Sequence, residues 1–254
     1  MTKVHIVCPS LSRADRVLTK NVFADLIIVV PERQAGEYQE HNPDNEIVGC
    51  PDEIKGLQAT RQWIYEKFRD VFHTDDDVMS FRRNYLLPGV KAHHDGVIGT
   101  EVDPKTATAI VQRTAETAKQ MGASIFGFAT IGDARNYDPT DPINLSGYNF
   151  NFTLGMFWDE RLHFPKEFQC GGDHYVCLLN AYYNRYAFFD TRFGVIVKGT
   201  FTDPGGMAQY RKQSDYEEGF RYLKMYFGDA VQKKVKKNRG KQSHEWEKTL
   251  KIPF

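Results

Sequence analysis

Residues 25–31 read DLIIVVP, an unbroken apolar run that ends at a proline. A strand that is apolar on both faces is typical of the centre of a parallel sheet, where helices cover both sides. Shorter β-rich runs lie before and after it, at residues 4–8 (VHIVC) and 46–50 (EIVGC), and each is also followed by a proline. The three runs predict three neighbouring strands.

Helical patterns separate these runs. Residues 32–39 and 56–69 have helical character, and the second segment carries Leu57, Ile64 and Phe68 on one face. A fourth short run then leads into Asp75-Asp76-Asp77. Strands that alternate with helices predict an α/β fold, with an open, mostly parallel sheet that helices flank.

The second half has a less regular pattern, which predicts a mixed C-terminal half. Residues 87–102 and 132–146 are expected to be loops, and residues 149–157 alternate like an exposed edge strand. The polar tail begins near residue 232. The other expected elements are helices at 104–121, 173–184 and 214–227 and strands at 124–129 and 193–198.

Composition excludes few functions. The 254 residues hold 33 Lys+Arg and 33 Asp+Glu, so net charge indicates no partner. The four cysteines form no C-x-x-C pair, which disfavours a thiolate zinc site. No apolar stretch approaches the roughly 20 residues of a membrane span. We therefore expect a cytoplasmic protein without a leader peptide or a membrane partner.

The acidic triplet Asp75-Asp76-Asp77 is the strongest candidate site. It follows an apolar strand directly, at the edge of the sheet where open α/β proteins bind ligands. Three adjacent carboxylates repel one another, and Mg²⁺ or Mn²⁺ relieves that repulsion while bridging to a diphosphate. In an extended chain Asp75 and Asp77 point to one side and Asp76 to the other. The alternative is an acidic loop that only caps the following segment.

The order of these motifs is familiar. Pro9-Ser10-x-x-Arg13 follows the first strand, Val30-Pro31-Glu32 with Tyr38 follows the second, and a helix with Arg61 precedes Asp75-Asp76-Asp77-Val78. This pattern resembles the nucleotide-sugar half of a GT-A glycosyltransferase. More narrowly, it resembles the TET-associated glycosyltransferases of phages, which modify hydroxymethylated pyrimidines in DNA. The resemblance is clearest over about the first 85 residues and weaker to about residue 206.

The resemblance implies a domain organisation and a set of site residues. A GT-A-like domain would span 1–206, with a donor half at about 1–100 and an acceptor half at about 101–206, and 207–254 would form a C-terminal helix and basic tail. Asp75 and Asp77 would hold Mn²⁺ or Mg²⁺. The nucleotide-sugar donor would lie against Pro9, Ser10, Arg13, Tyr38, Arg61, Asp75 and Asp76, with Arg13 near the diphosphate and Tyr38 either beside the base or only packed.

Asp173 is the candidate base. Gly171-Gly172-Asp173 occupies the place of the family's acidic motif, although the usual Glu-Asp pair is here Gly172-Asp173. A carboxylate can take the proton that an acceptor hydroxyl loses as it attacks, and the two glycines would let a ligand approach. The alternatives are that Asp173 is only a helix N-cap or that the adjacent His174 acts instead.

The predicted function is transfer of a sugar from a nucleotide sugar to a modified base. By the resemblance, the donor is a UDP-sugar of glucose or arabinose type and the acceptor is 5-hydroxymethylcytosine in phage DNA. A cationic tail favours double-stranded DNA as a partner through its phosphates; it contains Lys233, Lys234, Lys236, Lys237, Arg239 and Lys241. The alternatives are a glycosyltransferase with a non-DNA acceptor and a nucleic-acid-binding protein on an inactive scaffold.

Overall fold

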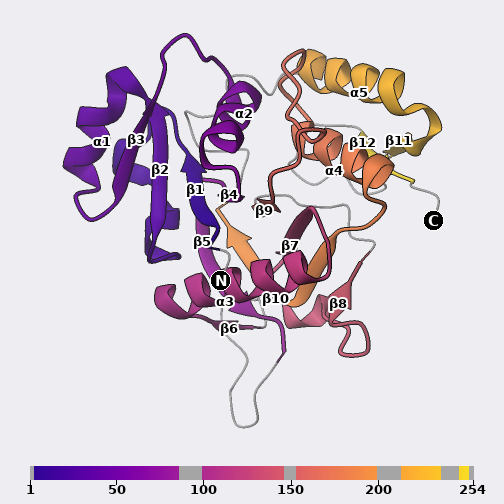
Figure 1. Ribbon diagram of the computed structural model, residues 1–254, viewed down its shortest axis with the longest axis horizontal. Coiled ribbons are helices and arrows are strands. Elements are labelled where there is room, and N and C mark those ends of the chain that lie inside the picture. Colours follow the sequence, from indigo (N-terminus) through magenta and orange to yellow (C-terminus); the bar gives the residue numbers. More distant parts are fainter. Residues whose placement is uncertain (1–2, 86–98, 146–152, 199–212, 236–245, 252–254) are drawn as a thin grey trace.

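One sheet lies between two layers of helices in the computed structural model (Figure 1). The structure describes residues 3–85, 99–145, 153–198, 213–235 and 246–251. Within these residues ten strands belong to the sheet, and its main path runs β3-β2-β1-β4-β9-β7-β10-β5-β6, with β8 paired to β10. The predicted α/β class, with an open sheet flanked by helices and a mixed C-terminal half, is confirmed.

The N-terminal half is a parallel array. Its strands are β1 (His5–Pro9), β2 (Leu26–Pro31), β3 (Glu46–Cys50) and β4 (Val71–Thr74); α1 (Ala35–His41) lies between β2 and β3, and α2 (Leu57–Phe68) between β3 and β4. Strand β1 pairs in parallel with both β2 and β4. The chain therefore changes direction across the sheet at β1, and the crevice beyond the carboxyl ends of β1 and β4 is where such folds bind ligands.

The C-terminal half mixes parallel and antiparallel pairs. Its strands are β5 (Val78–Arg83), β6 (Thr100–Glu101), β7 (Ile125–Ala129), β8 (Ile143–Asn144), β9 (Thr153–Met156) and β10 (Phe188–Val197). Its helices are α3 (Pro104–Gln120), α4 (Gly172–Tyr183) and α5 (Gln213–Phe227). The sequence patterns missed β5, placed β6 and β8 in loops, and began β10 at residue 193, because these strands depend on long-range pairing with β10 or β5.

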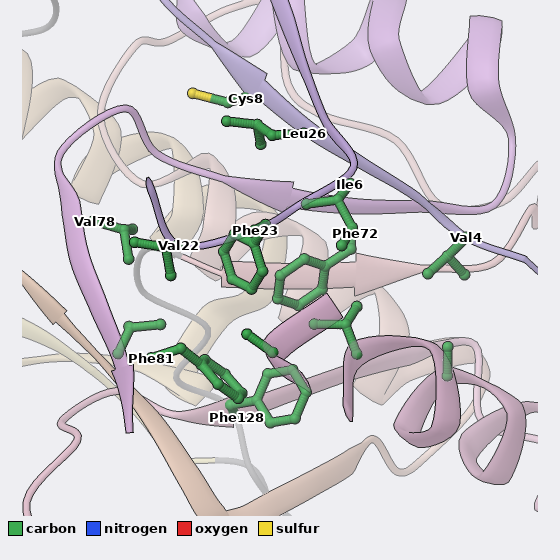
Figure 2. Packing of buried hydrophobic residues seen from close by; sticks show 14 of the residues in the cluster. Val4, Ile6, Cys8, Val22, Phe23, Leu26, Phe72, Val78, Phe81 and Phe128 are labelled. Atoms are coloured by element: carbon green, nitrogen blue, oxygen red, sulfur yellow. The ribbon is translucent and has the colours of Figure 1, made fainter. Parts of the chain in front are cut away.

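Two hydrophobic clusters hold the layers together. In β2, Leu26 and Ile28 belong to the cluster that includes Tyr38 of α1 and Val111 of α3, whereas Val29 belongs to the cluster under α2, α4 and α5. This alternation explains the continuous apolar run, because both faces of β2 are covered. Figure 2 shows the first cluster, in which aromatic rings gather at the centre; they include Phe23, Phe72, Phe81 and Phe128.

Strand β9 corrects one expectation. Residues 149–157 were expected to form an exposed edge strand, but β9 lies inside the sheet between β4 and β7, and all four of its residues are buried. The reason is Gly155, which pairs with Phe126 of β7. An added Cβ at Gly155 would lie 2.1 Å from the Phe126 ring, so the small residue leaves room for a large neighbour.

Replacing Gly155 with alanine is expected to destabilise the protein. The Phe126 ring cannot move freely, because it stacks on Phe72 at 5.8 Å and on Phe157 at 5.3 Å between ring centroids. Overpacking of a filled core costs about 1–3 kcal/mol and more where nothing can yield, so we expect a loss near the upper end. Urea unfolding measures it, and Gly36→Ala, at an open position, is the control. Equal stability of the two variants would contradict this packing.

The C-terminal segment is also more ordered than a polar tail. Strands β11 (Val231–Val235) and β12 (Trp246–Leu250) form an antiparallel hairpin. The Trp246 ring is buried against Tyr216 and Phe220 of α5, so it anchors the segment. Of the tail cations, Lys233 and Lys234 are exposed on β11, whereas Lys236, Lys237, Arg239 and Lys241 lie outside the described residues. No helix in the described part of the chain is long and apolar enough to span a membrane.

Candidate donor and transfer site

The acidic triplet lies at the carboxyl end of β4, beside the end of β1. Its backbone is held by two other segments, the turn at Leu18 and Thr19 and the residue after β10. The Thr19 hydroxyl donates to the Asp75 carbonyl at 2.5 Å, and the Leu18 amide donates to the Asp76 carbonyl at 2.9 Å. The Lys198 amide, just after β10, donates to the Asp77 carbonyl at 2.9 Å. The three carboxylates therefore project from a fixed backbone, which is the preorganisation that a binding site needs.

Asp76 is the centre of a buried polar network. Its carboxylate accepts hydrogen bonds from the Ser10 hydroxyl at 2.7 Å and from Arg13 Nη1 at 2.9 Å. The Tyr38 hydroxyl lies 2.8 Å from Ser10 Oγ and accepts from the Arg13 amide at 2.9 Å. The Tyr38 ring has no exposed surface, so it cannot flank a base. It instead fixes the loop after Pro9 that presents Ser10 and Arg13.

Asp75 and Asp77 differ in their partners. Asp75 Oδ1 accepts from Arg61 Nη2 of α2 at 2.6 Å. Asp77 Oδ1 is buried and has no hydrogen-bond partner among the described residues. Burial, followed by the charges of Asp75 and Asp76, raises the pKa of Asp77 to about 7. A buried carboxylate oxygen without a donor costs free energy, so this atom indicates a missing positive partner.

A divalent cation fits this position, although not as an all-protein cage. Among the described residues no three His, Cys, Asp or Glu side chains form a group that could hold a metal. Mg²⁺ and Mn²⁺ sites that bind phosphates commonly use one or two carboxylates, with the substrate and water completing the shell. Asp77, together with Asp75, whose Oδ1 also accepts from Arg61, would supply that number. Asp76 is already occupied by Ser10 and Arg13 and serves the loop instead.

Asp173 lies in the first turn of α4 and interacts electrostatically with Arg61. Burial alone would raise the pKa of Asp173, but the adjacent His174 and the Arg61 guanidinium hold it well below its usual range. His174 Nδ1 lies 3.3 Å from Asp173 Oδ1. The N-cap of α4 is Gly171, and no side chain caps the helix, so Asp173 is not the N-cap that the sequence left open. Arg61 thus bonds to the triplet and also lowers the pKa of the candidate base.

Comparison with protein families decides the class. The model of the TET-associated glycosyltransferase family matches residues 4–206. The chain belongs to this family. This glycosyltransferase has no significant match among curated proteins. Among solved structures it is similar to S. aureus TarS residues 1–349, with a TM-score of 0.43 and 11% identity, over 75% of this chain and 60% of that one.

Two residues near the triplet escaped the sequence patterns. Thr19 of the glycosyltransferase holds the triplet's backbone at both ends, since its hydroxyl also accepts from the Val78 amide at 3.1 Å. His73 is 1% exposed in β4, and neither ring nitrogen has a hydrogen-bond partner in the described structure. Burial, helped by Arg61, holds the pKa of His73 well below its usual value. Its position two residues before the triplet was the signal for His73, whereas Thr19 carried none.

Proposed function

We propose that the protein transfers a sugar from a UDP-sugar to the hydroxymethyl group of 5-hydroxymethylcytosine in double-stranded phage DNA. The observation that carries the proposal is the arrangement around Arg61. The guanidinium donates to Asp75 of the triplet, in which Asp77 has an unpartnered buried oxygen, and it interacts electrostatically with Asp173 at the start of α4. A family of glycosyltransferases whose members modify hydroxymethylpyrimidines supports this acceptor.

The donor would bind at the carboxyl ends of β1 and β4. Ser10 and Arg13 would contact the nucleotide, and Arg13 and Arg61, which Asp76 and Asp75 hold in place, would bring positive charge near the diphosphate. A divalent cation at Asp75 and Asp77, when bound, supplies further charge neutralisation for the leaving nucleoside diphosphate. Charged groups fixed before the reaction stabilise developing charge without reorganisation.

Asp173 would act on the acceptor. The hydroxymethyl oxygen forms a bond to the anomeric carbon, the bond from that carbon to the phosphate oxygen breaks, and its electron pair leaves with the diphosphate. The hydroxyl proton passes to the Asp173 carboxylate. Because the pKa of Asp173 is low, it is fully ionised but a weak base, so it accepts a hydrogen bond first and the proton late in the step. The acceptor group lies in the major groove, which a shallow approach can reach.

An activity matrix tests the proposal. The protein would be mixed with Mn²⁺, each of a panel of UDP-sugars including glucose and arabinose donors, and DNA with or without 5-hydroxymethylcytosine. A mass gain of one sugar is expected only on the hydroxymethylated DNA. No mass gain on DNA with any donor, combined with transfer to a protein or small molecule, would replace DNA with another acceptor. Absence of metal-dependent UDP binding would leave only the inactive scaffold.

The tail cations give a separate prediction about DNA. Because Trp246 and the hairpin pack on α5, truncation would disturb the fold, and substitution to glutamine is the better test. With all six tail cations replaced, DNA affinity should fall and the slope of log affinity against log salt should shrink by up to roughly 5. Donor affinity should not change. Fluorescence anisotropy over a salt series measures the slope, with Lys105→Gln plus Lys166→Gln as the control; an unchanged slope would exclude the tail from DNA binding.

A further inference from the structure

Lys248 is a buried cation outside the part of the chain that the family model matches. It lies on β12 and is only 8% exposed. Its ammonium group donates to the Cys170 carbonyl at 2.8 Å and lies 4.3 Å from the centroid of the Tyr216 ring. Its backbone amide donates to the Tyr216 hydroxyl at 3.1 Å. The C-terminal hairpin thus inserts one charged group between α5 and the segment that precedes α4.

That segment is the turn that begins α4 and leads to Asp173. Gly171, the N-cap of α4, has a φ of 105°, a conformation that favours glycine. A Cβ added there would lie 2.9 Å from Lys248 Nζ. The ammonium group therefore packs directly on the turn while it bonds the carbonyl of the preceding residue. Any displacement of Lys248 would therefore shift the turn and move Asp173, two residues after the glycine.

The charges around Asp173 come from three elements. His174 lies beside it on α4, and its carboxylate interacts electrostatically with Arg61 of α2 and Lys248 of β12. Burial lowers the pKa of Lys248 to about 8, while Asp173 and then Cys170 oppose that change. At neutral pH the lysine is mostly charged. A buried charge is costly, and an apolar side chain of similar length would fill the same space without that cost. Packing of the hairpin alone does not explain a lysine here.

We propose that Lys248 is a positioning residue of the transfer site: through the Cys170 carbonyl and the turn at Gly171, it sets the place of Asp173 relative to Arg61. The inference rests on the proposed role of Asp173 as the base. By this inference the C-terminal hairpin belongs to the acceptor side of the site, although it lies beyond the residues that the family model matches. Lys248 itself does not need to touch either substrate.

The test compares Lys248→Met with Lys251→Met, an exposed lysine directly after the same hairpin. In Lys248→Met the kcat for transfer should fall roughly 10- to 100-fold, because small misplacements of a reacting group have effects of this size. The affinity for UDP with Mn²⁺ should stay at the wild-type value, since the triplet is untouched. Lys248→Arg, which keeps the charge and the donor, should recover most of the rate. Lys251→Met should behave as wild type.

Crystal structures of the two methionine variants provide a readout that does not depend on turnover. Asp173 should be displaced from its wild-type place in Lys248→Met and unmoved in Lys251→Met. An unmoved Asp173, or a kcat equal to that of Lys251→Met, would overturn the inference. A parallel decrease of melting temperature, donor affinity and kcat would also overturn the inference, because it would show that Lys248 only stabilises the fold. If the wild type transfers sugar to no acceptor, the proposed function fails, while the crystallographic comparison still decides the positioning claim. Should Lys248→Met not fold, Lys248→Gln carries the same comparison.

Discussion

Replacing Asp77 with asparagine is expected to remove metal-dependent binding of the nucleotide and, with it, sugar transfer. Asp75 and Asp76 have cationic or hydroxyl partners in the structure, whereas Asp77 Oδ1 is buried without one. Asp77 is therefore the carboxylate of the triplet that is most available to a cation. Loss of the outer partners of a metal site costs 10- to 100-fold, so loss of a ligand should cost at least roughly 100-fold in UDP affinity. Calorimetric titration of UDP, with and without Mn²⁺, measures the change.

The same substitution should stabilise the metal-free protein at high pH. The pKa of Asp77 is about 7 in the folded protein, above the 3.8 of an ordinary aspartate. The unfolded chain therefore releases this proton first, and wild-type stability falls as pH rises from about 4 to about 7. Asparagine has no such proton. In EDTA the free energy of unfolding of the variant should exceed that of the wild type by on the order of 1–2 kcal/mol at pH 8. The gain is smaller than the full pKa shift implies, because the side chain is partly screened by solvent. At pH 3, where Asp77 is protonated in both states, the two proteins should not differ.

Asp44→Asn provides the control, because Asp44 is exposed and far in sequence from the triplet. It should change neither UDP binding nor the pH dependence of urea unfolding. If Asp77→Asn keeps metal-dependent UDP binding and shows no pH-dependent gain in stability, the cation does not bind at Asp77. The two measurements are independent, since one needs the metal and the other excludes it.

The parallel half of the fold was predictable because its signals are local. In β2 both faces are buried, so every residue from Leu26 to Val30 is apolar, and a proline ends the strand. The C-terminal half lacks such signals. The buried position of β9 inside the sheet depends on the fit of Gly155 to the Phe126 ring, and Phe126 belongs to another strand, β7. No pattern within residues 149–157 could distinguish this buried strand from an exposed one.

The candidate site shows the same limit. A triplet after an apolar strand indicates a carboxylate cluster at the edge of the sheet, and the structure places it there. Which carboxylates already have a cationic partner depends on Arg13 and Arg61, which reach the triplet from separate segments. Tyr38 illustrates the ambiguity of aromatic residues, since its ring packs in the core and only its hydroxyl serves the site. Lys248 carried no signal, because only the folded hairpin brings it to α4.

Replacing Asp173 with asparagine is expected to lower kcat for transfer by about 10²- to 10⁴-fold, the usual contribution of a positioned base. Asparagine keeps the shape of the side chain but cannot accept the hydroxyl proton. No hydrogen bond or ion pair joins Asp173 to the triplet in the described part of the chain, so the affinity for UDP with Mn²⁺ should be unchanged. The expected result is thus the reverse of the Asp77→Asn result in one respect: the donor binds and is not used. Single-turnover transfer to hydroxymethylated DNA, read by mass spectrometry, measures the rate.

His174→Gln is the matched variant, because His174 lies 3.3 Å from Asp173 and is the other group that could take the proton. If Asp173 is the base, His174→Gln should reduce the rate less than Asp173→Asn does, since it removes a neighbour that lowers the pKa of Asp173 but keeps the carboxylate. That pKa should rise in the variant, which strengthens the carboxylate as a base and offsets part of any loss of orientation. Full activity in Asp173→Asn together with a large loss in His174→Gln would show that the His174 imidazole is the base. Full activity in both would place the base outside α4.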